Sequence, residues 1–116
     1  MDKVSIIIPT YNRANVLPAS IQSVLQQTDA DFELLVIDDG SDDNTDTVVE
    51  SMNDARIRYL KMPANKGVAA ARNEGIRQAK YDYIAFQDSD DYWMPDKLEK
   101  QMTFMTQNPE TGLLYC

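Results

Sequence analysis

Short apolar runs alternate with stretches of helical periodicity along this chain. Four runs have the length and composition of β-strands: residues 4–8, 32–37, 57–60 and 83–86. The run at 57–60 alternates apolar with polar residues, as a strand nearer a sheet edge does. Apolar residues at the spacing of one helix face predict four helices: Leu17, Ile21, Val24 and Leu25 in the first, Val48, Val49 and Met52 in the second, residues 68–79 in the third, and Leu98, Met102 and Met105, following Pro95, in the fourth.

This alternation predicts an α/β fold with three layers, in which helices cover both faces of a mostly parallel sheet. Right-handed crossovers place every strand-to-helix turn at the carboxyl edge of such a sheet, where ligands of open α/β folds bind. Four polar turns are expected to meet there: residues 9–12, 38–41, 64–67 and 88–91. The sequence therefore predicts one crevice lined by segments that lie far apart in the chain.

Residues 112–116 have the apolar pattern of another buried strand, and the sequence ends there. We therefore expect a piece of a larger domain with apolar surface left uncovered. Unprotected strand edges and apolar patches promote self-association, so we expect a dimer or larger assembly. A monomeric mass by light scattering at working concentration would reject this expectation.

The composition narrows the range of functions. The 116 residues fit one domain, and the net charge of −8 disfavours nucleic acid or anionic lipid as the main partner. The absence of histidine excludes Ser-His-Asp and Cys-His catalysis and histidine-ligated zinc within this sequence. No apolar run is long enough to cross a bilayer and no export signal is visible, so we expect a cytoplasmic protein. Any metal would be held mainly by oxygen atoms.

An acidic turn follows the run at 83–86. Asp88 and Asp90 are separated by one residue, so their side chains share a face of an extended segment and a turn can bring both toward one ion. Oxygen ligands alone favour Mg²⁺ or Mn²⁺, and such a cation would let an acidic protein hold a diphosphate. Acidic clusters also solvate turns and cap helices, and the two residues alone leave that alternative open.

Asp38 and Asp39 end the second predicted strand. Gly40 permits a positive φ in the turn that follows, and Ser41 or Asp42 is a suitable cap for the next helix. These tasks do not require two consecutive aspartates at the end of a buried strand. We interpret Asp38 as structural and Asp39 as functional, because a carboxylate at this edge can accept a hydrogen bond from the imide N–H of a base.

Thr10, Tyr11, Lys66 and Arg72 lie in or beside the same turns. The Tyr11 ring could stack on a base, with Thr10 supplying hydroxyl or backbone contacts, although a plain core or surface tyrosine fits the pattern equally well. Lys66 and Arg72 flank the start of the third predicted helix, whose N–H groups favour anions, so either could meet phosphate. Arg72 could equally pair with an aspartate of the crevice.

Four segments, in this order, resemble the nucleotide-binding half of family 2 glycosyltransferases with the GT-A fold: residues 4–12, 36–41, 65–73 and 86–91. The resemblance covers essentially the whole chain, so residues 1–116 are expected to be the donor-binding portion without the acceptor-binding half. It implies inverting transfer of a sugar from a nucleoside diphosphate donor, expected to be a UDP-sugar, to a hydroxyl of a saccharide or lipid-linked acceptor. Bacterial capsule or cell-envelope polysaccharide synthesis is implied, in the cytoplasm or at the inner face of the membrane.

The same resemblance implies a role for each matched residue. Thr10 and Tyr11 would contact the nucleoside, and Asp39 would meet the base. Asp88 would approach the ribose or the metal, and Asp90 would ligate the Mg²⁺ or Mn²⁺ bound to the diphosphate. Lys66 and Arg72 are weaker matches as phosphate contacts. The carboxylate base that takes the acceptor proton belongs to a later part of the family's fold, and no residue here matches it.

Other readings of the chain remain. A non-catalytic nucleotide-binding or interaction module is compatible with a chain that lacks the acceptor half. A phosphoryl-transfer domain with an aspartyl nucleophile requires acidic residues after its first strand. This chain has Pro9, Thr10 and Tyr11 there, which disfavours that class. A dinucleotide-binding domain is disfavoured because the Gly-x-Gly-x-x-Gly pattern is absent after the first strand.

Overall fold

The computed structural model describes residues 3–26, 32–81, 83–87 and 113–114 of the chain. Its elements follow the order expected for an α/β protein: β1 (Val4–Thr10), α1 (Leu17–Leu25), β2 (Phe32–Asp38), α2 (Thr45–Ser51), β3 (Ile57–Lys61), α3 (Val68–Gln78), β4 (Tyr83–Phe86) and β5 (Leu113–Leu114). The fourth predicted helix and the acidic turn at 88–91 lie outside the described residues. Within the described part of the chain, no helix is both long and apolar enough to cross a membrane.

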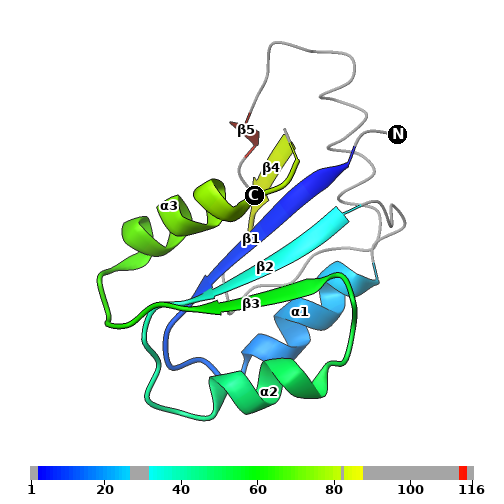
Figure 1. Cartoon of the computed structure of the whole chain (residues 1–116). Helices are drawn as coiled ribbons and strands as arrows, with labels where there is room; N and C mark the ends of the chain where they lie inside the picture. The colour runs from blue at the N-terminus through cyan, green and yellow to red at the C-terminus, as the bar shows by residue number, and fades with distance from the viewer. Residues whose placement is uncertain (1–2, 27–31, 82, 88–112, 115–116) are drawn as a thin grey trace.

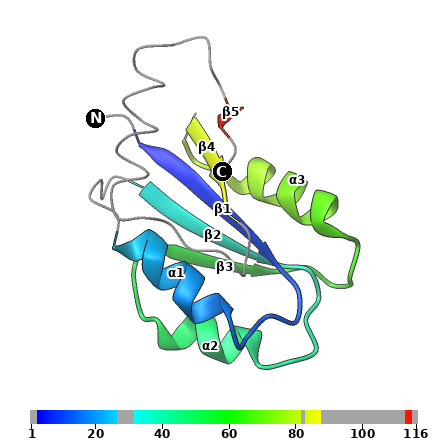
Figure 2. The ribbon, with the colours of Figure 1, turned by 180° about the vertical axis from the view of Figure 1, so that it is seen from behind.

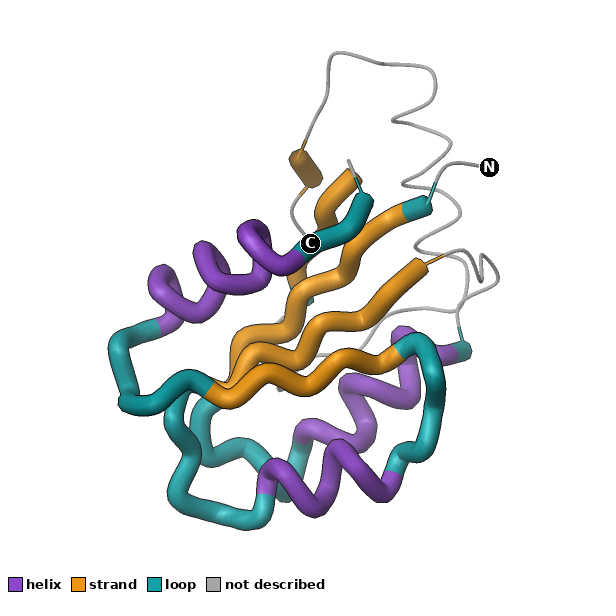
Figure 3. The backbone as a smooth tube through the Cα atoms, in the orientation of Figure 1, coloured by secondary structure: helices purple, strands orange, loops and turns teal. Residues whose placement is uncertain are grey.

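The strands form one sheet in the order β3-β2-β1-β4-β5, and every neighbouring pair is parallel. Helices α1 and α2 lie together on one face of this sheet, and α3 lies on the other (Figures 1 and 2). The tube view shows the same three layers, with the strands between the helices (Figure 3). The predicted α/β fold class with a parallel sheet and helices on both faces is therefore confirmed. β5, within the predicted strand at 112–116, pairs with β4.

Successive residues of a strand point to opposite faces of the sheet, and this alternation builds two cores. Ile6 and Ile8 of β1 join the side chains of α1 and α2 in one core, whereas Ile7 joins Ala71 of α3 in the other. All three isoleucines are fully buried. The same alternation carries past the strand ends, so consecutive polar residues there reach different helices.

Pro9 lies within the central strand β1. The sequence indicates a strand that closes at Pro9, but β1 continues to Thr10 because its pairing with β2 includes Pro9 opposite Ile37. Ile7 accepts a hydrogen bond from Gln87 N at 3.0 Å, so the backbone of residue 9, two positions on, also faces the β4 side. Proline has no N–H to donate there. Among the described residues, the β1–β4 pairs reach Ile7 and Phe86, and the β1–β2 pairs run on to Thr10.

The strand order reverses between β1 and β4. The chain leaves β1 toward β2 on one side and returns to β4 on the other. Ligands of open α/β folds bind outside the carboxyl ends of strands at such a switch point. A ligand site is therefore expected at the loops that follow β1, β2 and β4.

The start of α2 differs from the prediction. α2 begins at Thr45, and neither Ser41 nor Asp42 caps it. The Asp43 carboxylate instead accepts hydrogen bonds from the N–H of Thr45, at 3.1 Å, and from its hydroxyl. Ser41 does not cap because its hydroxyl oxygen accepts a hydrogen bond from the N–H of Asn12, a residue of a different loop.

Candidate functional site

Asp38 and Asp39 follow one another at the end of β2, and strand alternation sends them to opposite faces. Asp38 is fully buried on the side of α1 and α2. Its Oδ1 accepts a hydrogen bond from Ser41 N at 2.8 Å, and its Oδ2 accepts one from the Tyr59 hydroxyl. Burial and the neighbouring Asp38 carboxylate raise the pKa of Tyr59, so this hydroxyl keeps its proton as the donor. These contacts close the β2 turn and give Asp38 a structural task.

Asp39 reaches the α3 side of the sheet. Its carboxylate is 4% exposed, and Oδ1 and Oδ2 each accept a backbone N–H at 2.8 Å, from Lys66 and Gly67 respectively. Gly67 immediately precedes α3 and has a φ of 100°. A carboxylate at this helix N-terminus is stabilised by the helix dipole. Because an ionised carboxylate offers about four lone-pair positions, two remain for a further donor.

Gly40 allows the β2 and β3 loops to approach closely. It has a φ of 79°, a conformation that costs glycine little. A Cβ at this position would lie 2.8 Å from the backbone nitrogen of Asn65 and 2.9 Å from the carbonyl carbon of Ala64. The expected positive φ is thus observed, and the absent side chain lets the loop at 64–67 sit close enough to bind Asp39.

Thr10 and Tyr11 lie at the end of β1 beside this group. Asp39 N donates to Thr10 O at 2.8 Å, which joins the two strand ends. The Thr10 side chain is buried, and its Oγ1 has no hydrogen-bond partner among the described residues. Tyr11 is 39% exposed, so the structure excludes a core tyrosine and leaves its ring accessible. The alternation of β1 places the Thr10 side chain on the face of α1 and α2, as it does Ile6 and Ile8, so the exposed Tyr11 ring is the side chain of this strand end that fits a ligand site with Asp39.

The two predicted phosphate contacts lie on either side of the start of α3. Lys66 is exposed, and it borders a surface depression of about 450 Å³ together with Met62 and Arg77. The Arg72 guanidinium carbon lies 5.8 Å from the centroid of the Phe86 ring. Phe86 is the last residue of β4, two positions before Asp88. The structure therefore brings a cation to the strand that leads into the acidic turn.

Asp88 and Asp90 are outside the described residues, so the predicted metal ligands have no geometry in this structure. Among the residues that are described, no group of three or more acidic or cysteine side chains could hold a metal ion. The donor chemistry of the two aspartates nevertheless suits a hard cation, since oxygen ligands are what Mg²⁺ and Mn²⁺ prefer. In the sequence they follow Gln87, the last described residue after β4.

Sequence reasoning did not single out Gln87 or Asn12. Gln87 is 2% exposed, and its Nε2 donates to Ser20 Oγ of α1 at 3.2 Å. A polar residue at the buried end of an apolar strand was the signal that could have found it. Asn12 has a φ of 51°, a conformation that asparagine tolerates better than most residues, and that preference was the available signal.

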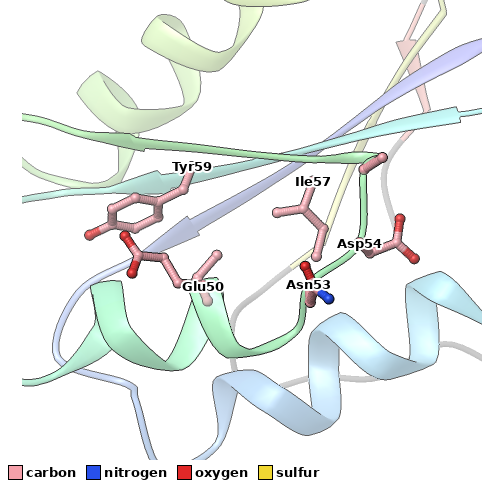
Figure 4. Close-up of a pocket in the computed structure, with 7 residues that line it drawn as sticks. Glu50, Asn53, Asp54, Ile57 and Tyr59 are labelled. Carbon is pink, nitrogen blue, oxygen red and sulfur yellow. The ribbon is translucent and has the colours of Figure 1, made fainter.

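A separate depression lies between α2 and β3, away from the loops just described. Figure 4 shows Glu50, Asn53, Asp54, Ile57 and Tyr59 around it, and its volume is about 390 Å³. Two of these side chains are carboxylates, and Asp54 is paired with Arg56 at 2.9 Å. An acidic lining does not favour a diphosphate, so this depression is no rival to the carboxyl edge as a nucleotide site.

Known proteins resemble this chain in sequence and in structure. The chain is 50% identical over 105 residues to UDP-Glc:alpha-D-GlcNAc-diphosphoundecaprenol beta-1,3-glucosyltransferase WfgD of Escherichia coli; the match covers 90% of this chain and 42% of WfgD. It superimposes on S. aureus TarS 1–349, solved in complex with UDP-GlcNAc, with a TM-score of 0.84 and 31% identity, covering 90% of this chain and 31% of that one. The chain thus spans less than half of either protein.

A third likeness concerns the fold alone. The mannosyltransferase PcManGT from Pyrobaculum calidifontis, solved with GDP-Man and Mn²⁺, superimposes with a TM-score of 0.82 at 24% identity; the match covers 88% of this chain and 32% of that chain.

The family model described as Glycosyl transferase family 2 matches residues 5–116, nearly the whole sequence. The parallel sheet and helices match the Rossmann-like GT-A arrangement of such neighbours. As the four sequence segments predicted, the chain belongs to glycosyl transferase family 2.

Proposed function

We propose that this chain is the donor-binding part of an inverting glycosyltransferase that uses a nucleoside diphosphate sugar. The observation that carries the proposal is the arrangement of Asp39 and Tyr11. A nearly buried carboxylate with free acceptor positions lies one backbone hydrogen bond from the strand end that bears an exposed aromatic ring. This combination can read the edge of a base with the carboxylate and cover its face with the ring.

The proposed base and donor class rest on the chemistry of Asp39 and its neighbours and on the similarity to TarS. The imide N–H of uracil is a suitable donor to Asp39, and Thr10 and Tyr11 would contact the nucleoside. TarS was solved with UDP-GlcNAc and has a comparable sheet, which supports UDP-sugar as the donor class. The proposal includes a preference for uridine over other nucleosides. Titration with other nucleoside diphosphates tests this preference directly.

Asp88 and Asp90 would hold the cation, Mg²⁺ or Mn²⁺, while Lys66 and Arg72 would meet the diphosphate. A bridging cation would allow a protein with a net charge of −8 to hold a diphosphate, because carboxylates and phosphates repel each other. When bound, the cation would neutralise the charge of the departing diphosphate. The chain's own residues bind the nucleoside and orient the donor. The general base is assigned to a part of the protein beyond this chain.

The acceptor is proposed to be a saccharide, free or linked to a lipid. WfgD is described as acting on GlcNAc-diphosphoundecaprenol, and its identity to this chain supports an acceptor of that class. Synthesis of a capsule or other cell-envelope polysaccharide follows from such an acceptor. The transfer would correspondingly take place at the cytoplasmic side of the membrane.

Sugar transfer by the intact protein containing this chain tests the proposal. Asp90→Ala should lower the rate of transfer by about a hundredfold or more, since a Lewis-acid cation supplies several kcal/mol of transition-state stabilisation. The matched control is Asp46→Ala, which removes an exposed carboxylate from the first turn of α2 and should leave the rate unchanged. Equal transfer before and after Asp90→Ala would instead favour a non-catalytic nucleotide-binding module.

A further inference from the structure

We propose that Asn12 is a positioning residue of the donor site, which holds the loop carrying Tyr11 against the loop that follows Asp39. The inference rests on the proposed nucleotide-binding function and concerns a residue to which that function assigns no contact. Asn12 does not need to touch the donor. Its effect passes through Tyr11, its neighbour in sequence.

The backbone at Asn12 is turned in an unusual way. Its φ is 51°, in the left-handed region that most side chains avoid. Among the described residues, the other non-glycine residue with a positive φ is Asn53, at 49°. Asparagine adopts this conformation at little cost because its short amide side chain can bond locally to the backbone. The sequence thus places a suitable residue where the chain turns sharply after β1.

Reciprocal hydrogen bonds join Asn12 to the β2 loop. Its N–H donates to Ser41 Oγ at 2.8 Å, and its Oδ1 accepts from Asp42 N at 2.8 Å. Ser41 is itself fixed, because its N–H donates to the buried Asp38 carboxylate at 2.8 Å. The contact of Asn12 therefore ends on a buried residue that is itself hydrogen-bonded to the end of β2.

Further bonds extend this attachment on both sides. Before Asn12, Asp39 N donates to Thr10 O at 2.8 Å. After it, Ala14 N donates to Asp43 Oδ2 at 3.1 Å. Burial opposes ionisation of Asp43, but hydrogen bonds from Thr45 and Ala14 outweigh it and lower its pKa, so it stays an ionised acceptor. The β1–β2 pairing is in effect continued through the two loops by side-chain bonds.

Tyr11 lies between two fixed points of this attachment, Thr10 and Asn12. Its backbone is therefore held while its ring stays exposed. A loop ordered before binding saves the conformational entropy that a free loop loses when the ligand binds. Loss of the Asn12 side chain would return that cost to the binding step without removing any group that contacts the nucleotide.

The test is titration of UDP, in the presence of Mn²⁺, into the intact protein and its Asn12→Gly variant. Glycine keeps access to positive φ and the backbone N–H that donates to Ser41 Oγ, but it has no Oδ1 for Asp42 N, so the change removes the side-chain bond without straining the backbone. We expect UDP binding to weaken about five- to tenfold, the size of one lost hydrogen bond with its ordering effect. The affinity for Mn²⁺ alone should stay as in the wild type.

Asn53→Gly is the matched control. It makes the same substitution at a positive φ, beside the depression of Figure 4, and should leave UDP affinity unchanged. Asn12→Asp keeps an oxygen acceptor, and at an ionic strength that screens its charge it should restore binding to within about twofold of the wild type. Melting temperatures of the two glycine variants should fall by similar amounts.

Two results would overturn the inference, and one separates it from the function it rests on. Wild-type UDP affinity in Asn12→Gly would contradict a positioning role. A loss of affinity matched by Asn53→Gly would show only a general effect on stability. Failure of the wild-type protein to bind UDP or another nucleoside diphosphate would contradict the proposed function itself.

Discussion

Replacing Asp39 by alanine is expected to weaken UDP binding by the intact protein by about a hundredfold. The carboxylate is proposed to accept the imide N–H of the base, and a hydrogen bond to a charged group contributes about 1.5–3 kcal/mol. The substitution also releases the N–H groups of Lys66 and Gly67, each held at 2.8 Å. The loop at 64–67 would lose its attachment to β2, so contacts to the base and the loop position are lost together.

The metal serves as an internal control for this substitution. Asp39 is not a proposed ligand, so the Asp39→Ala variant should bind Mn²⁺ as the wild type does. Calorimetric titrations of UDP and of Mn²⁺ alone, with melting curves to verify folding, separate base recognition from ion binding. UDP affinity that is unaffected, or a loss shared equally by UDP and Mn²⁺, would contradict the role assigned to Asp39.

Replacing Glu33 by alanine should lower the free energy of unfolding by about 1–3 kcal/mol, the cost of leaving hydrogen-bond donors without a buried acceptor. Glu33 is 6% exposed at the amino end of β2, away from the proposed donor site. Its Oε2 accepts the Ser5 hydroxyl at 2.6 Å and Lys80 N at 2.7 Å, and its Oε1 accepts Arg58 Nη1 at 3.0 Å. Alanine would leave all these donors without this partner.

The same carboxylate makes stability depend on pH. Burial raises the pKa of Glu33, but hydrogen bonds from Ser5, Lys80 and Arg58 and the charge of Arg58 outweigh burial, so the pKa lies below its usual value. A lowered pKa in the folded state adds stability above the unfolded-state pKa, and this stability is lost as pH falls through the folded-state pKa. Acid should therefore destabilise the wild type through Glu33.

Urea unfolding across the acidic range measures this effect. Glu33→Gln removes the titration while keeping the size of the side chain, so its stability should be lower at neutral pH and should change less on acidification. Glu50→Gln, at an exposed position of α2, is the control and should follow the wild type. An acid-induced loss of the same size in Glu33→Gln and the wild type would contradict the assignment.

Much of the fold could be predicted because it depends on local patterns. The spacing of Leu17, Ile21 and Val24 predicts a helix face, and all three side chains are fully buried in α1. The opposite faces that Asp38 and Asp39 reach likewise follow from strand alternation, a rule that needs no knowledge of distant contacts. Where a residue's environment is set by its own strand or helix, the sequence pattern was sufficient.

Predictions that failed or were missing involve partners far apart in the chain. Ser41 has the chemistry of a helix cap, but its hydroxyl oxygen binds the N–H of Asn12, 29 positions away. The amide of Gln87 reaches Ser20, 67 positions away. Neither contact follows from local propensity, because each exists only once parallel strands have brought the loops together. The continuation of β1 past Pro9 has the same origin, since it depends on which neighbouring strand residue 9 faces.

Loops distant in sequence are proposed to form a nucleotide site at the carboxyl edge, and a divalent cation is proposed to complete it. Calorimetric titration of UDP into the intact protein, with and without Mn²⁺, tests this most directly, with other nucleoside diphosphates as competitors. We expect binding that requires the metal and prefers UDP. Weak binding of equal strength with and without Mn²⁺ would contradict it.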